Sequence, residues 1–218
     1  MTGSDHPLQT RRAADTARQV IAGDGCALRL LANTQRYDAA KRQRVTIVFE
    51  ILAGLPPYGD LPTVIGGGES PVYREGYVIR FDEAETAWVG NFQRGLTDLD
   101  FVAALDDLRV LVIAGGSPYL VDPQTRSVEE VGGAFERCHP MPGSTGFLLT
   151  DTTDITLLAP SGVVWQSRRL AWDGLRVDAI DSHHVDGHGR HYDDTWHAFR
   201  VDVGDGSAIG GAFAGPAH

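Results

Sequence analysis

A strand–turn–strand pattern recurs along the chain at intervals of about 40 residues, and this repeat limits the possible folds more than any other feature. In each copy an apolar strand meets a turn of Pro, Gly or acidic residues, and the chain then returns. Three copies are clear, and an earlier copy is looser. The copies, in chain order, are Val78–Val89, Tyr119–Val128, Thr156–Trp165 and Phe199–Ile209.

The spacing of the copies favours a propeller-like fold. Aligned on Phe81, Val121, Leu158 and Val201, they lie 40, 37 and 43 residues apart. A further apolar strand is predicted before each of the last three copies, at 109–113, 146–150 and 175–180. Units of this length are typical of β-propeller blades, whose sheets pack face to face. We therefore predict a mainly β chain with a small or incomplete β-propeller-like repeat domain, and an antiparallel barrel or sandwich is the alternative.

Residues 1–44 differ from the rest of the chain in charge and in pattern. They carry about +4, whereas residues 45–218 carry about −14. Apolar residues recur at helical spacing within 9–22, and a second short helix is predicted within Ala27–Ala40. We expect a basic N-terminal extension, helical or disordered, over 1–44 and an acidic β-repeat domain over 45–218. A native start near Val45 is a hypothesis that an intact-mass measurement would test.

Composition limits the class of protein. The chain has 218 residues, 42% of them hydrophobic, and a formal net charge of −10. No run approaches the ~20 apolar residues of a membrane span, and no apolar segment follows Arg11 and Arg12 as in a signal peptide. Cys26 and Cys138 are far apart and form no metal or redox spacing. We therefore expect a cytoplasmic protein whose body binds neither nucleic acid nor membrane.

Four segments carry a resemblance to a group of proteins. They are Leu52–Gly59, Trp88–Gln93, Trp172–Leu175 and Phe199–Asp202. Together they resemble segments of uncharacterised bacterial proteins with β-propeller-like repeats. The resemblance implies a propeller-like fold for most of residues 45–218. It implies no activity and no functional residue.

The densest polar cluster lies in residues 181–197, which hold five of the eight histidines. Imidazole and carboxylate groups are common ligands of zinc and related metals. In an extended strand His184 and Asp186 would share one face. Gly187 and Gly189 instead predict a turn, so we expect a polar hairpin loop, and a metal site is the alternative. The candidate metal ligands are His184, Asp186, His188 and His191.

Other catalytic motifs are absent or fragmentary. The sequence has no Gly-x-Ser-x-Gly elbow, and the glycines at 66–68 lack the Lys of a phosphate-binding loop. Cys138 and His139 are adjacent, so in a strand their side chains face opposite ways and cannot form a dyad. We therefore assign no catalytic and no cofactor-binding residue, and we expect no cofactor.

The four tryptophans divide into two groups. Trp88, Trp165 and Trp196 lie in or beside repeat copies, where an aromatic ring is expected to pack between blades. Trp172, beside Asp173, lies outside the copies. Trp172 is therefore the candidate for contact with a ligand or a partner, provided that it is accessible.

These features favour a non-catalytic binding module. A rigid repeat scaffold with acidic loops would present one face to a protein partner, and an acidic face attracts a basic partner. A bacterial immunity or regulatory protein fits this description. The alternative is a metal-dependent hydrolase or a sugar-handling enzyme that uses residues 181–197. A structural subunit of a larger assembly is a third hypothesis.

Overall fold

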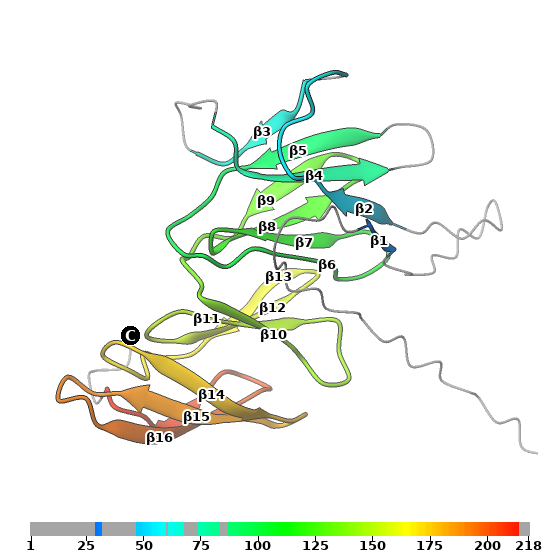
Figure 1. Ribbon diagram of the computed structural model, residues 1–218. Helices are drawn as coiled ribbons and strands as arrows, with labels where there is room; N and C mark the ends of the chain where they lie inside the picture. Colours follow the sequence, from blue (N-terminus) through cyan, green and yellow to red (C-terminus); the bar gives the residue numbers. More distant parts are fainter. Residues whose placement is uncertain (1–28, 32–46, 60, 68–73, 83–86, 214–218) are drawn as a thin grey trace, which may run out of the picture.

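The computed structural model describes residues 29–31, 47–59, 61–67, 74–82 and 87–213. These residues form strands in four sheets and no helix. The sheets follow one another along the chain, and we name them A to D. Figure 1 shows them stacked in this order, from sheet A at the top to sheet D at the bottom. The prediction of a mainly β repeat fold is confirmed. In this part of the chain nothing forms a helix of the length and apolarity that a bilayer crossing requires.

Sheets B, C and D share one topology, in which four antiparallel strands are joined in chain order. Sheet B consists of β6 (Phe101–Ala104), β7 (Val110–Ala114), β8 (Ser117–Asp122) and β9 (Ser127–Glu130). Sheet C consists of β10 (Arg137–Pro140), β11 (Phe147–Thr150), β12 (Ile155–Ala159) and β13 (Gly162–Gln166). Sheet D consists of β14 (Leu175–Ile180), β15 (His184–Arg190), β16 (Trp196–Asp202) and β17 (Ala208–Gly210).

Sheet A has five strands in the order β1-β2-β4-β5-β3, and only β3 pairs in parallel, with β5. Its strands are β1 (Arg29–Leu31), β2 (Val48–Ile51), β3 (Thr63–Ile65), β4 (Tyr77–Asp82) and β5 (Trp88–Phe92).

Strand β1 lies in the segment predicted as an N-terminal extension. It pairs antiparallel with β2, so the prediction of a helix within Ala27–Ala40 is wrong for residues 29–31. The rest of 1–44, with the helix predicted within 9–22, lies outside the described residues. The boundary between 44 and 45 stays a prediction.

Three apolar cores hold the stack together, one between each pair of neighbouring sheets. The core between sheets A and B includes Phe81 and Val112. The core between B and C includes Leu111 and Leu149, and the core between C and D includes Leu148 and Val201. Among the described residues no core cluster joins sheet D to sheet A. The four sheets therefore form an open stack of blade-like units, and the alternative of one barrel or a two-sheet sandwich is wrong.

Burial along individual strands reflects the place of each sheet in the stack. All five residues of β7 are buried because sheet B is covered on both faces. In β15 only every second residue is buried. Sheet D therefore packs on sheet C with one face and leaves its other face, the outer face, in contact with solvent.

Two tryptophans link neighbouring sheets, as predicted. The indole nitrogen of Trp88 donates to the carbonyl of Pro123, in the turn between β8 and β9 of sheet B, at 3.0 Å. That of Trp165 donates to the carbonyl of Val203, in the turn between β16 and β17 of sheet D, at 2.8 Å. The prediction fails for Trp196, which lies on the outer face of sheet D and is 46% exposed.

The four residues used to align the repeat all lie on the third strand in the spatial order of their sheet. In sheet A, counted from β1, this strand is β4. Val121, Leu158 and Val201 point toward the preceding sheet, whereas Phe81 points toward the following one. The first copy is therefore out of phase by one residue, because successive side chains of a strand alternate between faces.

Candidate functional site

The His- and Asp-rich segment forms the middle of sheet D. Strand β15 pairs with β14 on one side and with β16 on the other. Gly187, which predicted a turn, lies on the inner face directly opposite Phe199. A Cβ atom on Gly187 would overlap the Phe199 ring, and one on Gly189 would overlap a backbone carbonyl of the preceding loop. Both glycines permit close packing within a strand, so the prediction of a polar hairpin loop is wrong.

The polar residues of β15 share the outer face of sheet D. His184, Asp186 and His188 alternate with buried residues, as strand geometry requires. Asp186 accepts two hydrogen bonds from the Arg200 guanidinium, at 2.7 and 3.0 Å. Nδ1 of His188 lies 2.6 Å from a carboxylate oxygen of Asp178. The outer face thus consists largely of charged side chains that already pair with one another.

These pairings leave the metal hypothesis without geometric support. His191 lies beyond the end of β15, and its Nδ1 is 3.0 Å from Asp193. Within the described ranges, no three His, Cys, Asp or Glu side chains come together in a group that could hold a metal ion. Metal binding by His184, Asp186, His188 or His191 stays a prediction.

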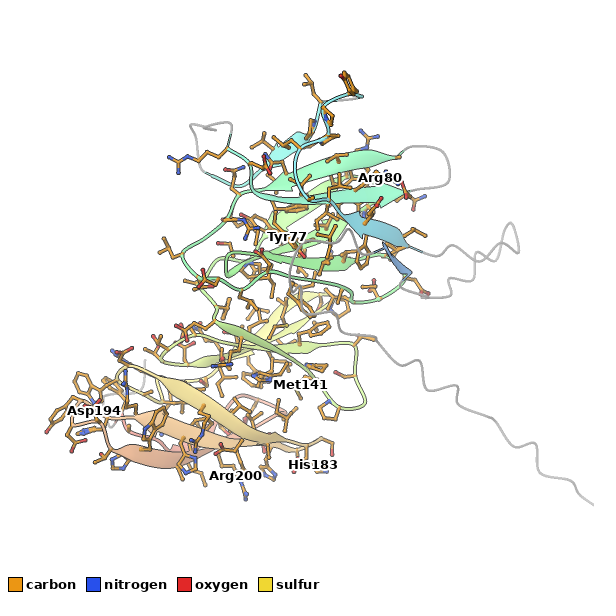
Figure 2. All side chains as sticks on the ribbon, viewed as in Figure 1. Tyr77, Arg80, Met141, His183, Asp194 and Arg200 are labelled. Atoms are coloured by element: carbon orange, nitrogen blue, oxygen red, sulfur yellow. The ribbon has the colours of Figure 1, made fainter. Side chains whose placement is uncertain are left out.

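A hollow of about 300 Å³ lies on the outer face over β15, β16 and β17. Its polar wall is the Asp186–Arg200 ion pair, and its apolar wall includes Ile209, which is largely exposed. Figure 2 shows Arg200 on the side of sheet D that faces away from the stack. The two charges of this polar wall neutralise each other.

Cys138 and His139 lie on β10 and serve different cores. Cys138 packs partly buried against the core between sheets B and C, and burial raises the pKa of its thiol far above the usual range. His139 pairs with Leu148 of the core between C and D, and burial lowers the pKa of its imidazole. The two side chains therefore face opposite sides of sheet C, as strand geometry predicts for adjacent residues.

An exposed aromatic cluster lies at one end of sheet D. Trp172 is 42% exposed and Tyr192 is 74% exposed, so the accessibility required of Trp172 is met. The Trp172 ring centroid lies 5.8 Å from that of Tyr192 and 5.2 Å from that of Phe213. We call these rings and two adjacent imidazoles the Trp172 cluster, which consists of Trp172, His191, Tyr192, His197 and Phe213.

Four segments supply the cluster: the loop before β14, the turn between β15 and β16, the start of β16 with His197, and the chain after β17. Figure 2 shows Asp194, in that turn, at one end of sheet D and His183 at the other end. Backbone hydrogen bonds fix two of the segments, because the Trp172 amide donates to the carbonyl of Arg190 and the His191 amide donates to that of Thr195. The cluster is therefore both exposed and held in place.

Carboxylates surround the cluster. Asp193 accepts hydrogen bonds from the hydroxyl and amide of Thr195 and interacts with His191, which holds its pKa far below the usual range. Asp173 and Asp194 both approach the guanidinium of Arg190, at 3.0 and 3.6 Å. Their side chains are 75% and 85% exposed. Two carboxylates therefore share one cation in contact with water.

Comparisons with known proteins assign neither a family nor a function. No family model, no curated protein and no solved structure matches this chain. The repeated four-stranded sheets agree with the fold that the resemblance implies, and membership of that bacterial group stays a prediction.

Sequence reasoning singled out Trp172 but missed the residues around it. The sequence analysis placed His191 and His197 in the polar segment 181–197 but did not connect them with Trp172. No motif in the sequence singled out Tyr192 or Phe213. They meet Trp172 because β15, β16 and β17 pair in one sheet and end beside one another. A correct assignment of β15 would have placed Tyr192 at the same end of the sheet as Trp172.

Proposed function

We propose that this chain is a non-catalytic protein-binding module and that the Trp172 cluster is the centre of its contact surface. The observation that carries the proposal is the pair of rings, Trp172 and Tyr192, held by hydrogen-bonded loops yet open to water. Trp, Tyr and Arg are the residues that most often dominate the binding energy of protein interfaces. Fixed loops lose little conformational entropy on binding, which favours affinity.

The remainder of the molecule supports this role as a scaffold. Three apolar cores hold the four sheets in one stack. The ion pairs on the outer face of sheet D continue outward from the cluster as a polar surface, and protein interfaces commonly have a polar rim around an aromatic centre. A bacterial immunity or regulatory protein remains the proposed class.

Affinity capture from a lysate of the native host tests the proposal. Immobilised wild-type protein is compared with a Trp172→Ala/Tyr192→Ala variant by quantitative mass spectrometry. We expect at least one protein to be retained by the wild type and reduced about 10-fold or more by the variant, because hot-spot truncations cost ~2 kcal/mol or more.

A matched control removes two exposed side chains elsewhere, in a Tyr58→Ala/Leu96→Ala variant. This control should retain the same protein. If no captured protein depends on the Trp172 cluster, or if both variants lose it equally, the proposal is wrong. Circular dichroism of each variant confirms that the sheets are intact.

A further inference from the structure

The rings of the Trp172 cluster meet nearly at right angles. The Trp172 plane makes an angle of 89° with that of Tyr192 and 88° with that of His191. In such an edge-to-face pair one ring presents only its edge, so its own faces stay free of the partner ring. Perpendicular aromatic walls of this kind recognise cationic side chains, because the face of an aromatic ring is electronegative.

The cluster already holds one cation of its own chain. The Arg169 guanidinium carbon lies 5.5 Å from the Trp172 ring centroid and 4.7 Å from the Phe213 centroid. Arg169 also donates to the carbonyls of Ala171 and Trp172, at 2.9 and 2.7 Å. These rings are therefore oriented so that a guanidinium can stack on them.

The exposed charge beside the cluster is negative at Arg190, because its guanidinium is shared by the two largely exposed carboxylates of Asp173 and Asp194. The other charged groups nearby have their own partners. Asp193 pairs with His191. Arg168 and Arg169 donate to the backbone carbonyls of Phe213 and Trp172. The whole of residues 45–218 adds a charge of about −14. Such a field accelerates the approach of a cationic partner and repels an acidic one.

We infer that the Trp172 cluster and the carboxylates of Asp173 and Asp194 bind an Arg- or Lys-rich segment of a protein partner. The inference rests on the proposed function and adds the chemistry of the partner. A cationic side chain of that segment packs on the exposed face of Trp172 or Tyr192. A second cation pairs with Asp173 and Asp194, which together have more negative charge than Arg190 can neutralise.

Peptide titration followed by nuclear magnetic resonance tests this chemistry. The indole N–H signal of Trp172, assigned with a Trp172→Phe variant, is recorded during addition of an alternating Arg-Gly peptide. An alternating Glu-Gly peptide and a neutral oligosaccharide serve as the other two probes. We expect saturable shifts with the basic peptide only, and an affinity that falls as salt is added.

Two variants separate the aromatic and the ionic contributions. Tyr192→Ala should lower the affinity for the basic peptide about 5- to 30-fold, because it removes a cation–π contact. Asp173→Asn/Asp194→Asn should also lower this affinity and should make it depend less on salt. A control variant, Asp98→Asn/Glu136→Gln, removes the same charge from exposed positions in another part of the molecule and should bind as the wild type does.

Three outcomes would overturn the inference: no shift with the basic peptide, shifts with the oligosaccharide alone, or an equal loss in the control variant. The oligosaccharide result would assign the cluster to a sugar. Failure here leaves the proposed function testable on its own, because capture that depends on Trp172 and Tyr192 would still identify a protein-binding surface, with a partner that is not basic.

Discussion

The Phe199 ring lies over Gly187 on the inner face of sheet D, and this contact determines how β15 packs. We predict that Gly187→Ala lowers the free energy of unfolding by about 1–3 kcal/mol, because the added methyl group overlaps the ring and the Arg176 carbonyl. Urea denaturation measures the loss. The double variant Gly187→Ala/Phe199→Leu should recover part of it, since it removes the ring. Unchanged stability of Gly187→Ala would contradict the packing of β15 against β16.

At the scale of single residues, the sequence predicts which side chains of a strand share a face, but not which residues of other strands they pack against. The placement of His184 and Asp186 on one face follows from strand geometry alone. The role of Gly187 does not, since interior glycine in a strand is unfavourable unless a neighbour fills the space, and the neighbour comes from another strand. The contact of Trp172 with Phe213 is likewise hidden in the sequence, because it depends on where β17 ends.

At the scale of elements, most apolar strands were predicted, but the apolar strands β3 and β6 and the polar strands β10 and β15 were missed. Strands β7, β11 and β14 agree with the apolar runs at 109–113, 146–150 and 175–180. Strand β10 has the sequence Arg-Cys-His-Pro and lies at the edge of sheet C, so nothing in its pattern marks it. Strand β15 was missed because only Val185 on its inner face is apolar: the other inner residues are glycines, and every outer residue is polar. Both strands form because their neighbours supply hydrogen-bonding partners.

Hydrogen exchange tests the assignment of β15 directly. As an inner strand of sheet D, residues 184–190 pair on both sides, so we expect their amides to exchange slowly, on the scale of global unfolding. Peptides that cover the turn at 191–195 should exchange much faster. Mass spectrometry after proteolysis reports both segments in one experiment. Equally fast exchange in residues 184–190 and 191–195 would mean that this segment is a loop and that β15 is not a strand of sheet D.

At the scale of the whole molecule, the two ends of the stack differ from its interior. Each interior interface is apolar on both sides, whereas the outer face of sheet D has ion pairs such as Asp186–Arg200. Sheet A has Arg80 between Glu50 and Asp82, on the face opposite the core residues Ile79 and Phe81. Closing the ring would bury both charged faces, and buried ion pairs repay their desolvation poorly. The charged ends therefore favour the open stack over a closed propeller.

A distance between the two ends tests the open stack. Spin labels are attached at Arg80→Cys and Arg200→Cys in a Cys26→Ser/Cys138→Ala background, and Figure 2 shows these two positions at opposite ends of the stack. Three sheet-to-sheet spacings of ~10 Å predict a separation of about 30 Å or more. Double electron–electron resonance measures this range. A control pair at Asp178→Cys and Arg200→Cys lies on β14 and β16 of the same outer face, two strands and ~10 Å apart, and should broaden the continuous-wave spectrum. Similar broadening by the first pair would mean that sheet D packs on sheet A, because only a closed ring brings those faces within one spacing of each other.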